Sequence, residues 1–98
     1  MSVLVIQHPV ADFGDWKKAF ENDPVGRAKN GVTRHVIYRT ADDPDYVVVN
    51  LEFSSRDQAQ LFLQALRELW RRVGDEIGFG SPDAVQTRIL DEVERVDY

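Results

Sequence analysis

Two short runs of the chain are apolar at consecutive positions, and they constrain its fold more than any other feature. Val3–Ile6 is apolar throughout, and Tyr46–Val49 continues through Leu51 to Phe53. Runs of this length rich in β-branched residues predict strands. Successive side chains of a strand point to opposite faces, so these strands present apolar side chains on both faces of their sheet. We therefore predict that both faces of the sheet are covered.

Two segments have apolar residues three and four positions apart, which is typical of helices with one buried face. Asp12 can cap the first of them, which ends before Pro24. Ser54 and Ser55 can cap the second, which continues for about five turns and ends at Gly74.

Two further strands, Val32–Thr40 and Ala84–Leu90, complete the order β-α-β-β-α-β. This order predicts a ferredoxin-like α+β fold, a four-stranded antiparallel sheet with two helices on one face. The first and third strands lie at its centre. With 98 residues, the chain has room for one core, so residues 1–98 are expected to form a single domain.

Two helices can cover only one face of this sheet, which leaves the apolar second face of the central strands open. A second copy of the chain, packed sheet against sheet, is the simplest cover. We therefore predict a homodimer. The alternative is a monomer with some apolar surface, because scattered exposed valines are normal.

Three stretches carry a resemblance to a known family. Asp12–Trp16 opens the first helix, Asp43-Pro44 precedes the valine-rich strand, and Glu52–Ser55 leads into the second helix. The chain resembles the dimeric α+β barrel superfamily, and within it the small stand-alone proteins related to antibiotic biosynthesis monooxygenases. The superfamily also includes haem-degrading monooxygenases, muconolactone isomerases and polyketide cyclases. The resemblance implies a flat aromatic or polyketide-like substrate, bound between sheet and helices without metal, flavin or other cofactor.

The candidate site depends on the register of the second and third strands. If the turn at 41–45 pairs Thr40 with Tyr46, His35 lies opposite Leu51 and faces the helices, while Arg34 lies opposite Glu52 on the other face. A slip of one residue reverses these faces.

On that register His35 is the best candidate for a catalytic base, because the pKa of histidine lies near neutrality. The candidate substrate-binding residues are Trp16, Phe62 and Trp70 as aromatic walls and Arg88 as an anion contact. Histidines and tryptophans of this kind are also common as ordinary packed residues. A cavity of roughly 300 Å³ or more favours ligand binding, and a filled core favours packing.

Two other readings stay open beside a cofactor-independent monooxygenase. The chain could be a non-enzymatic ligand-binding or structural homodimer, or an isomerase or cyclase of the same superfamily. A haem-degrading activity fits poorly, because no histidine follows Trp70. His8 closes the first strand or lines a pocket mouth, and Gly78–Pro82 is a candidate flap.

Composition narrows the possible partners and locations. A net charge of −5 argues against a nucleic-acid-binding surface. No apolar run approaches the length of a membrane span, and the start of the chain lacks a signal-peptide pattern, so we expect a cytoplasmic protein. The absence of cysteine excludes thiolate chemistry, and the two distant histidines lack metal-ligand spacing, so no metal site is expected.

Overall fold

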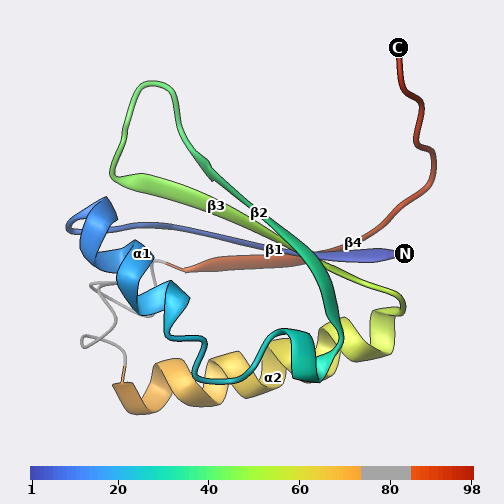
Figure 1. The fold of residues 1–98 in the computed structure, drawn as a ribbon, viewed down its shortest axis with the longest axis horizontal. Coiled ribbons are helices and arrows are strands. Elements are labelled where there is room, and N and C mark those ends of the chain that lie inside the picture. Colours follow the sequence, from blue (N-terminus) through green and yellow to red (C-terminus); the bar gives the residue numbers. More distant parts are fainter. Residues whose placement is uncertain (74–84) are drawn as a thin grey trace.

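The computed structural model describes residues 1–73 and 85–98, and it has the predicted ferredoxin-like topology (Figure 1). The elements in chain order are β1 (Ser2–Pro9), α1 (Phe13–Glu21), the short 3-10 helix η1 (Ala28–Asn30), β2 (Val32–Arg39), β3 (Tyr46–Phe53), α2 (Arg56–Val73) and β4 (Gln86–Asp91). The strands form one antiparallel sheet in the order β2-β3-β1-β4, which confirms the predicted central strands. Both helices lie on the same face of this sheet (Figure 1).

Local capping rules explain where the helices begin. The Asp12 side chain accepts a hydrogen bond from the backbone N–H of Asp15 at 2.9 Å. Before α2, the Ser55 hydroxyl accepts one from the backbone N–H of Gln58 at 3.2 Å. Each bond satisfies a donor that the first helical turn leaves without a partner.

The register of β2 and β3 is the one that the turn at 41–45 predicts. His35 pairs with Leu51, and Arg34 pairs with Glu52. The Arg34 Nε lies 3.6 Å from the Glu52 Oε2, so the expected cross-strand ion pair is present. The sheet therefore has a helix face and an open face, as the alternation of residues predicts.

The core fills the space between the helix face and the two helices. Its sheet residues are Leu4, Ile6, Val47, Val49, Leu51 and Phe53, and its helix residues include Trp16, Ala59, Phe62, Leu63 and Trp70. On the open face of the central strands, Val3, Val5 and Val48 are only half-buried. The burial of the sheet is thus one-sided in a single copy of the chain.

The predicted bounds of three strands differ from the structure, and the smallest difference is in β2, which ends at Arg39 rather than Thr40. β1 does not end at Ile6 but continues to Pro9, because Gln7 and His8 still pair with β3. β4 runs from Gln86 to Asp91, one residue beyond the predicted end at Leu90. Its predicted start at Ala84 lies outside the described residues, as does the candidate flap Gly78–Pro82. Neither helix, over the residues that the structure describes, is long and apolar enough to cross a membrane.

Candidate ligand-binding cavity

A cavity opens between α1, the connection from α1 to β2, α2 and the helix face of the sheet. Its enclosed volume is about 90 Å³, and the hollow measures about 630 Å³ when the solvent-open space at its mouth is included. The enclosed part is smaller than the roughly 300 Å³ that favours a small-molecule site. An aromatic ligand therefore has to occupy the mouth or displace the walls.

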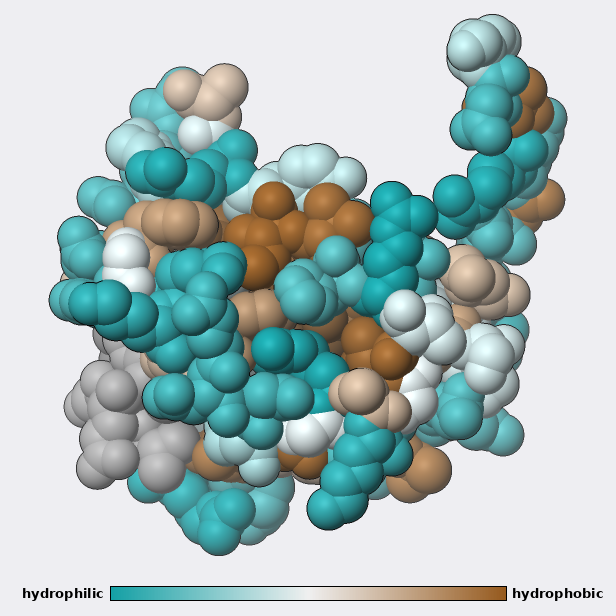
Figure 2. Space-filling model, in the orientation of Figure 1, coloured by the Kyte–Doolittle hydropathy of each residue, from teal (hydrophilic) through white to brown (hydrophobic). Residues whose placement is uncertain are grey.

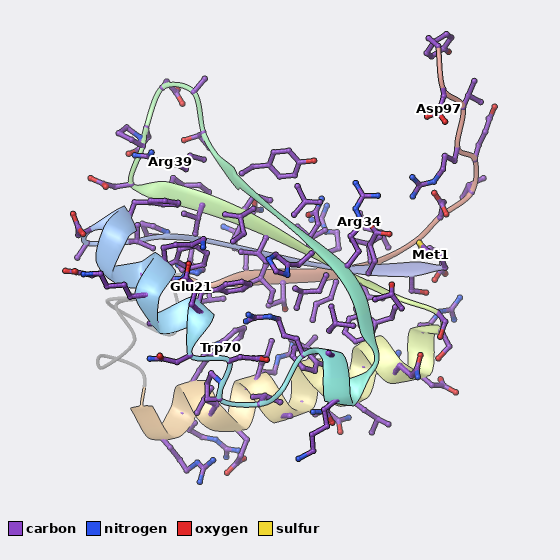
Figure 3. The ribbon with its side chains drawn as sticks, in the orientation of Figure 1. Met1, Glu21, Arg34, Arg39, Trp70 and Asp97 are labelled. Carbon is purple, nitrogen blue, oxygen red and sulfur yellow. The ribbon has the colours of Figure 1, made fainter. Side chains whose placement is uncertain are left out.

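Four aromatic side chains, two from each helix, line this cavity: Trp16, Phe20, Phe62 and Trp70. The ring centroids of Trp16 and Phe20 lie 5.3 Å apart at a tilt of 32°. In Figure 3, Trp70 projects from α2 toward α1 and the sheet. The three aromatic residues predicted as walls thus line one cavity, and Phe20 adds a fourth ring.

His8 places an imidazole in the wall of the cavity. It shares the helix face of β1 with Leu4 and Ile6, and only 1% of its surface is exposed. Its Nδ1 lies 2.9 Å from the Pro9 carbonyl oxygen, and its ring meets the Trp16 ring edge-on at 5.9 Å. Burial lowers the pKa of His8, which favours the neutral imidazole at neutral pH.

From the sequence, His8 either closes the first strand or lines the mouth of a pocket, and the structure places it in the cavity wall. Its position two residues after Ile6 was the available signal, because a strand that continues past Ile6 returns its side chain to the helix face. When Nδ1–H donates to the carbonyl of Pro9, Nε2 is the nitrogen that carries no proton. That tautomer suits a group that accepts a hydrogen bond or a proton.

His35 faces the helix side, as predicted, but it is exposed and does not belong to the described lining of the cavity. Its ring meets Phe20 edge-on at 5.2 Å, so Phe20 stands between His35 and the cavity. Burial of part of the ring lowers the pKa of His35, and the positive charges of Arg27 and Lys17 lower it further.

Arg88 lies on the opposite side of the sheet from the cavity. It pairs with Val5 in the β1–β4 register, so its side chain belongs to the open face. Its neighbours Thr87 and Ile89 pair with Ile6 and Leu4 on the helix face. The structure therefore brings Trp16, Phe62 and Trp70 together but separates Arg88 from them.

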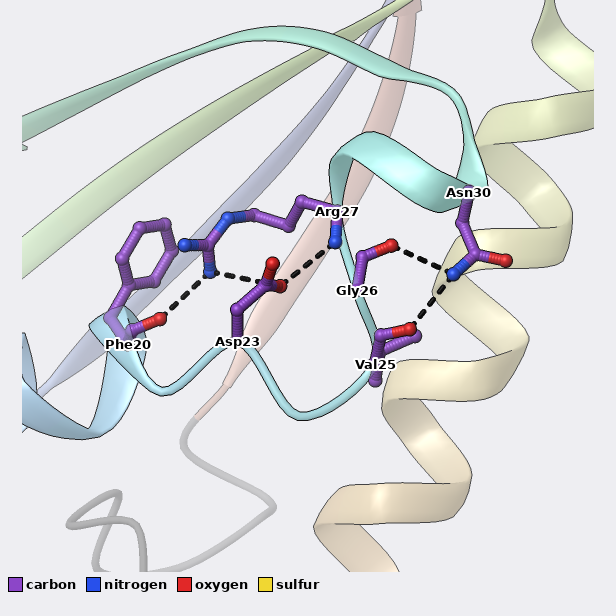
Figure 4. Close-up of polar contacts among 6 residues, drawn as sticks. All are labelled: Phe20, Asp23, Val25, Gly26, Arg27 and Asn30. Carbon is purple, nitrogen blue, oxygen red and sulfur yellow. Dashed lines mark hydrogen bonds and ion pairs between the residues drawn. The ribbon is translucent and has the colours of Figure 1, made fainter.

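The connection from α1 to β2 builds one rim of the cavity, a feature that sequence reasoning missed (Figure 4). The guanidinium carbon of Arg27 lies 3.8 Å from the centre of the Phe20 ring, and its Nη1 donates to the Phe20 carbonyl at 2.9 Å. The Asp23 Oδ1 accepts from the backbone N–H of Arg27 at 2.8 Å. These contacts fix an ion-paired rim around an otherwise mainly aromatic and aliphatic wall.

Asn30 holds the same connection together. Its Nδ2 donates to the carbonyl oxygens of Val25 at 2.8 Å and Gly26 at 2.7 Å. Asp23 and Gly26 adopt positive φ values of 49° and 85°, which bend the chain sharply there.

Within the described residues, no group of three or more His, Asp or Glu side chains could hold a metal ion.

Neither a family model nor a curated protein matches this sequence, whereas solved structures match its fold. SnoaB, a cofactor-independent oxygenase from Streptomyces nogalater, solved in a mutant form, superposes with a TM-score of 0.74 at 13% identity, over 99% of this chain and 97% of that chain. A monooxygenase from Streptomyces coelicolor, in complex with nanaomycin D, gives 0.66 at 16% identity, over 99% and 91%.

A dimeric ferredoxin-like protein from an uncultured marine organism gives a TM-score of 0.67 at 13% identity, over 97% of each chain. These structures cover almost the whole chain, so the expected fold resemblance to antibiotic biosynthesis monooxygenase-like proteins is confirmed. Fold alone does not define chemistry, so the residues of the cavity are what bear on function.

Proposed function

We propose that this protein binds a small, flat, hydroxylated aromatic or polyketide-like compound in the cavity, and that it acts on this compound as a cofactor-independent monooxygenase. The observation that carries the proposal is the convergence of four aromatic rings and the His8 imidazole on one cavity. The fold likeness to a cofactor-independent oxygenase and to a monooxygenase bound to nanaomycin D supports it.

A hydroxylated aromatic compound can supply every electron that this reaction needs. It loses one hydrogen from its hydroxyl group and one from a ring carbon, and that carbon gains one oxygen atom of dioxygen. The other oxygen atom leaves with the two hydrogens as water, so the products are a quinone and water. Removal of the hydroxyl proton makes the ring electron-rich and starts the reaction, so the protein's task is to hold the ring and accept that proton.

Two imidazoles compete for the role of proton acceptor. His35 is the base that the sequence predicts, but Phe20 lies between its ring and the cavity. His8 is part of the cavity wall itself, and because burial lowers its pKa, one of its ring nitrogens carries no proton at neutral pH. We assign the role to His8, with Trp16, Phe62 and Trp70 holding the ring. Arg88 keeps a role as an anion contact only for a ligand on the open face.

The small enclosed volume favours a second candidate, a homodimer whose aromatic residues only pack. Ligand binding without oxygen consumption would indicate a non-enzymatic binding protein, an isomerase or a cyclase.

We also propose that the protein forms a homodimer through the open face. The half-buried Val3, Val5 and Val48 at its centre and the fold likeness to a dimeric ferredoxin-like protein support this.

The test begins with a thermal-shift screen of the purified protein against hydroxylated aromatics, quinones, lactones, fatty acids and haem. A ligand that binds the folded state raises the melting temperature, and the rise grows with the logarithm of the ligand concentration relative to its Kd. For a phenolic hit, with 1-naphthol as the reference compound, dissolved oxygen is then followed. We expect one dioxygen consumed per quinone formed.

Replacing each histidine in turn shows which of the two, His8 or His35, is the base. We expect His8→Gln to reduce turnover by about 100-fold or more, the usual contribution of a positioned base. We expect His35→Gln to leave it within about threefold, because this ring lies outside the cavity wall. Unchanged turnover in His8→Gln contradicts the assignment, and a hit list without any aromatic compound contradicts the proposed ligand class.

A further inference from the structure

The last seven residues form an extended segment that we call the arm (residues 92–98). It leaves the end of β4 and rises away from the helices, on the side of the open face (Figure 1). Val93 is 96% exposed, Val96 is 55% exposed and Tyr98 is fully exposed. Three exposed apolar side chains within seven residues give this segment an apolar surface that a second protein surface can bury.

The arm leaves the domain from a fixed point. The Asp91 carboxylate accepts hydrogen bonds from Arg56 Nη2 at 2.6 Å and from the Ser2 hydroxyl at 3.0 Å. The backbone N–H of Glu92 donates to the Met1 carbonyl at 3.0 Å. The start of the arm is therefore bound to α2 and β1, and this attachment directs the remaining residues outward.

The open face combines apolar side chains with a few charged ones, as interfaces do. Val3, Val5 and Val48 lie on its two central strands, while Arg34 and Arg88 lie on the outer strands β2 and β4. Asn50 and Glu52 of the central strand β3 also lie on this face. Figure 2 shows hydrophobic residues in the hollow between the β2–β3 hairpin and the arm. In Figure 3, Arg34 and Asp97 lie on the same side of the sheet, away from the helices.

The charge of the arm is opposite to that of Arg88 on the open face. The arm carries three carboxylates, on Glu92, Glu94 and Asp97, and one guanidinium, on Arg95. Arg95 pairs with Glu92 within the arm, Nε to Oε1 at 2.6 Å. Glu94 and Asp97 therefore give its outer part a negative charge. On the open face, Arg34 is paired with Glu52, and Arg88 on β4 carries the positive charge that the arm can meet.

We propose that the arm of one copy lies against the open face of a second copy and holds the dimer together. This inference rests on the homodimer under the proposed function, but not on the ligand or the reaction. The occupant is a second copy because the arm points away from its own sheet, and because its charge and apolar residues match a surface that each copy carries. In the dimer, Val93, Val96 and Tyr98 lose water contact, and the carboxylates of Glu94 and Asp97 face Arg88 of the second copy.

Sedimentation equilibrium of full-length variants tests the apolar contacts. We expect the triple variant Val93→Ser, Val96→Ser, Tyr98→Ser to raise the dimer dissociation constant by about tenfold or more, since a few apolar anchors dominate most interfaces. The control is Leu61→Ser, an equally exposed apolar residue on α2 (66% exposed), which should leave the constant unchanged. Circular dichroism checks that both variants fold.

A charge exchange tests the pairing. Arg88→Glu should weaken the dimer, and adding Glu94→Arg and Asp97→Arg to it should restore part of the loss. The proposal is overturned if the wild-type chain is a monomer, if the arm variant dimerises like the wild type, or if the charge exchange gives no recovery. Ligand titration of the same variants is a separate readout, so loss of the dimer with intact binding distinguishes this proposal from the proposed function.

Discussion

At the scale of single residues, His8 combines burial with a titratable group. It is almost fully buried, and its burial lowers the pKa of the imidazole. The unfolded chain binds a proton at this residue below about pH 6.5, whereas the folded chain resists protonation until a lower pH. Between these two values the unfolded state holds more protons, so the free energy of unfolding must fall as the pH falls.

We predict that His8→Gln flattens the pH dependence of stability between about pH 7 and pH 5, because its titration is then absent from both states. His35→Gln is the matched control, and it should flatten the curve less, because solvent screens this exposed ring. Urea unfolding at a series of pH values measures both. An unchanged slope in His8→Gln would show that His8 titrates alike in the folded and unfolded chain.

At the scale of elements, the sequence predicted what short-range rules determine. Asp12 and Ser55 cap the helices, and the turn at 41–45 sets the register of His35 against Leu51. Short-range sequence rules did not predict the structure of the α1–β2 connection. Its η1 helix and its bend at Asp23 depend on contacts with Phe20 and on hydrogen bonds inside the connection, which no periodic pattern reveals.

The side chain of Asn30 stabilises this connection, and its contribution can be measured. We predict that Asn30→Ala lowers the free energy of unfolding by about 1 kcal/mol, because it removes two hydrogen bonds to backbone carbonyls. It should also weaken ligand binding, since Val25 and Arg27 line the cavity. Lys29→Ala, at an exposed neighbouring position, is the control for urea unfolding. Equal stabilities of the two variants would contradict the assigned role of Asn30.

At the scale of the whole molecule, the central strands explain both the core and the open face. The alternation of β1 and β3 places one set of apolar residues against the helices and leaves Val5 and Val48 half-buried on the other side. The runs of consecutive apolar residues allowed the sequence to predict apolar side chains on both faces of these strands. The placement of Arg88 was not readable, because the register of β4 depends on its pairing with β1 and not on its own pattern.

We predict that Val48→Glu prevents dimer formation while the chain remains folded. Val48 lies on the open face, so the new carboxylate reaches water in a single copy but is buried without a partner in the dimer. Burial of two such charges should raise the dimer dissociation constant by more than about 100-fold. Leu61→Glu, on the exposed side of α2, is the control in sedimentation equilibrium. A dimeric Val48→Glu protein would refute the open face as the interface.

The central claim is that the cavity between sheet and helices binds a flat aromatic compound. The chain has two tryptophans, Trp16 and Trp70, and both line this cavity, so their fluorescence reports directly on its occupant. The measurement is a quenching titration with a hydroxylated naphthoquinone, corrected with free N-acetyltryptophanamide. It is made on the wild type, on Ala19→Phe, which adds a ring to the cavity lining, and on Ala65→Phe, whose added ring lies on the exposed face of α2.

We predict saturable quenching of the wild type and of Ala65→Phe, and an affinity about tenfold lower or worse in Ala19→Phe, because the added ring occupies the ligand's space. Quenching that rises linearly like that of free tryptophanamide, or an unchanged affinity in Ala19→Phe, would contradict a ligand in this cavity and leave the aromatic residues with packing alone.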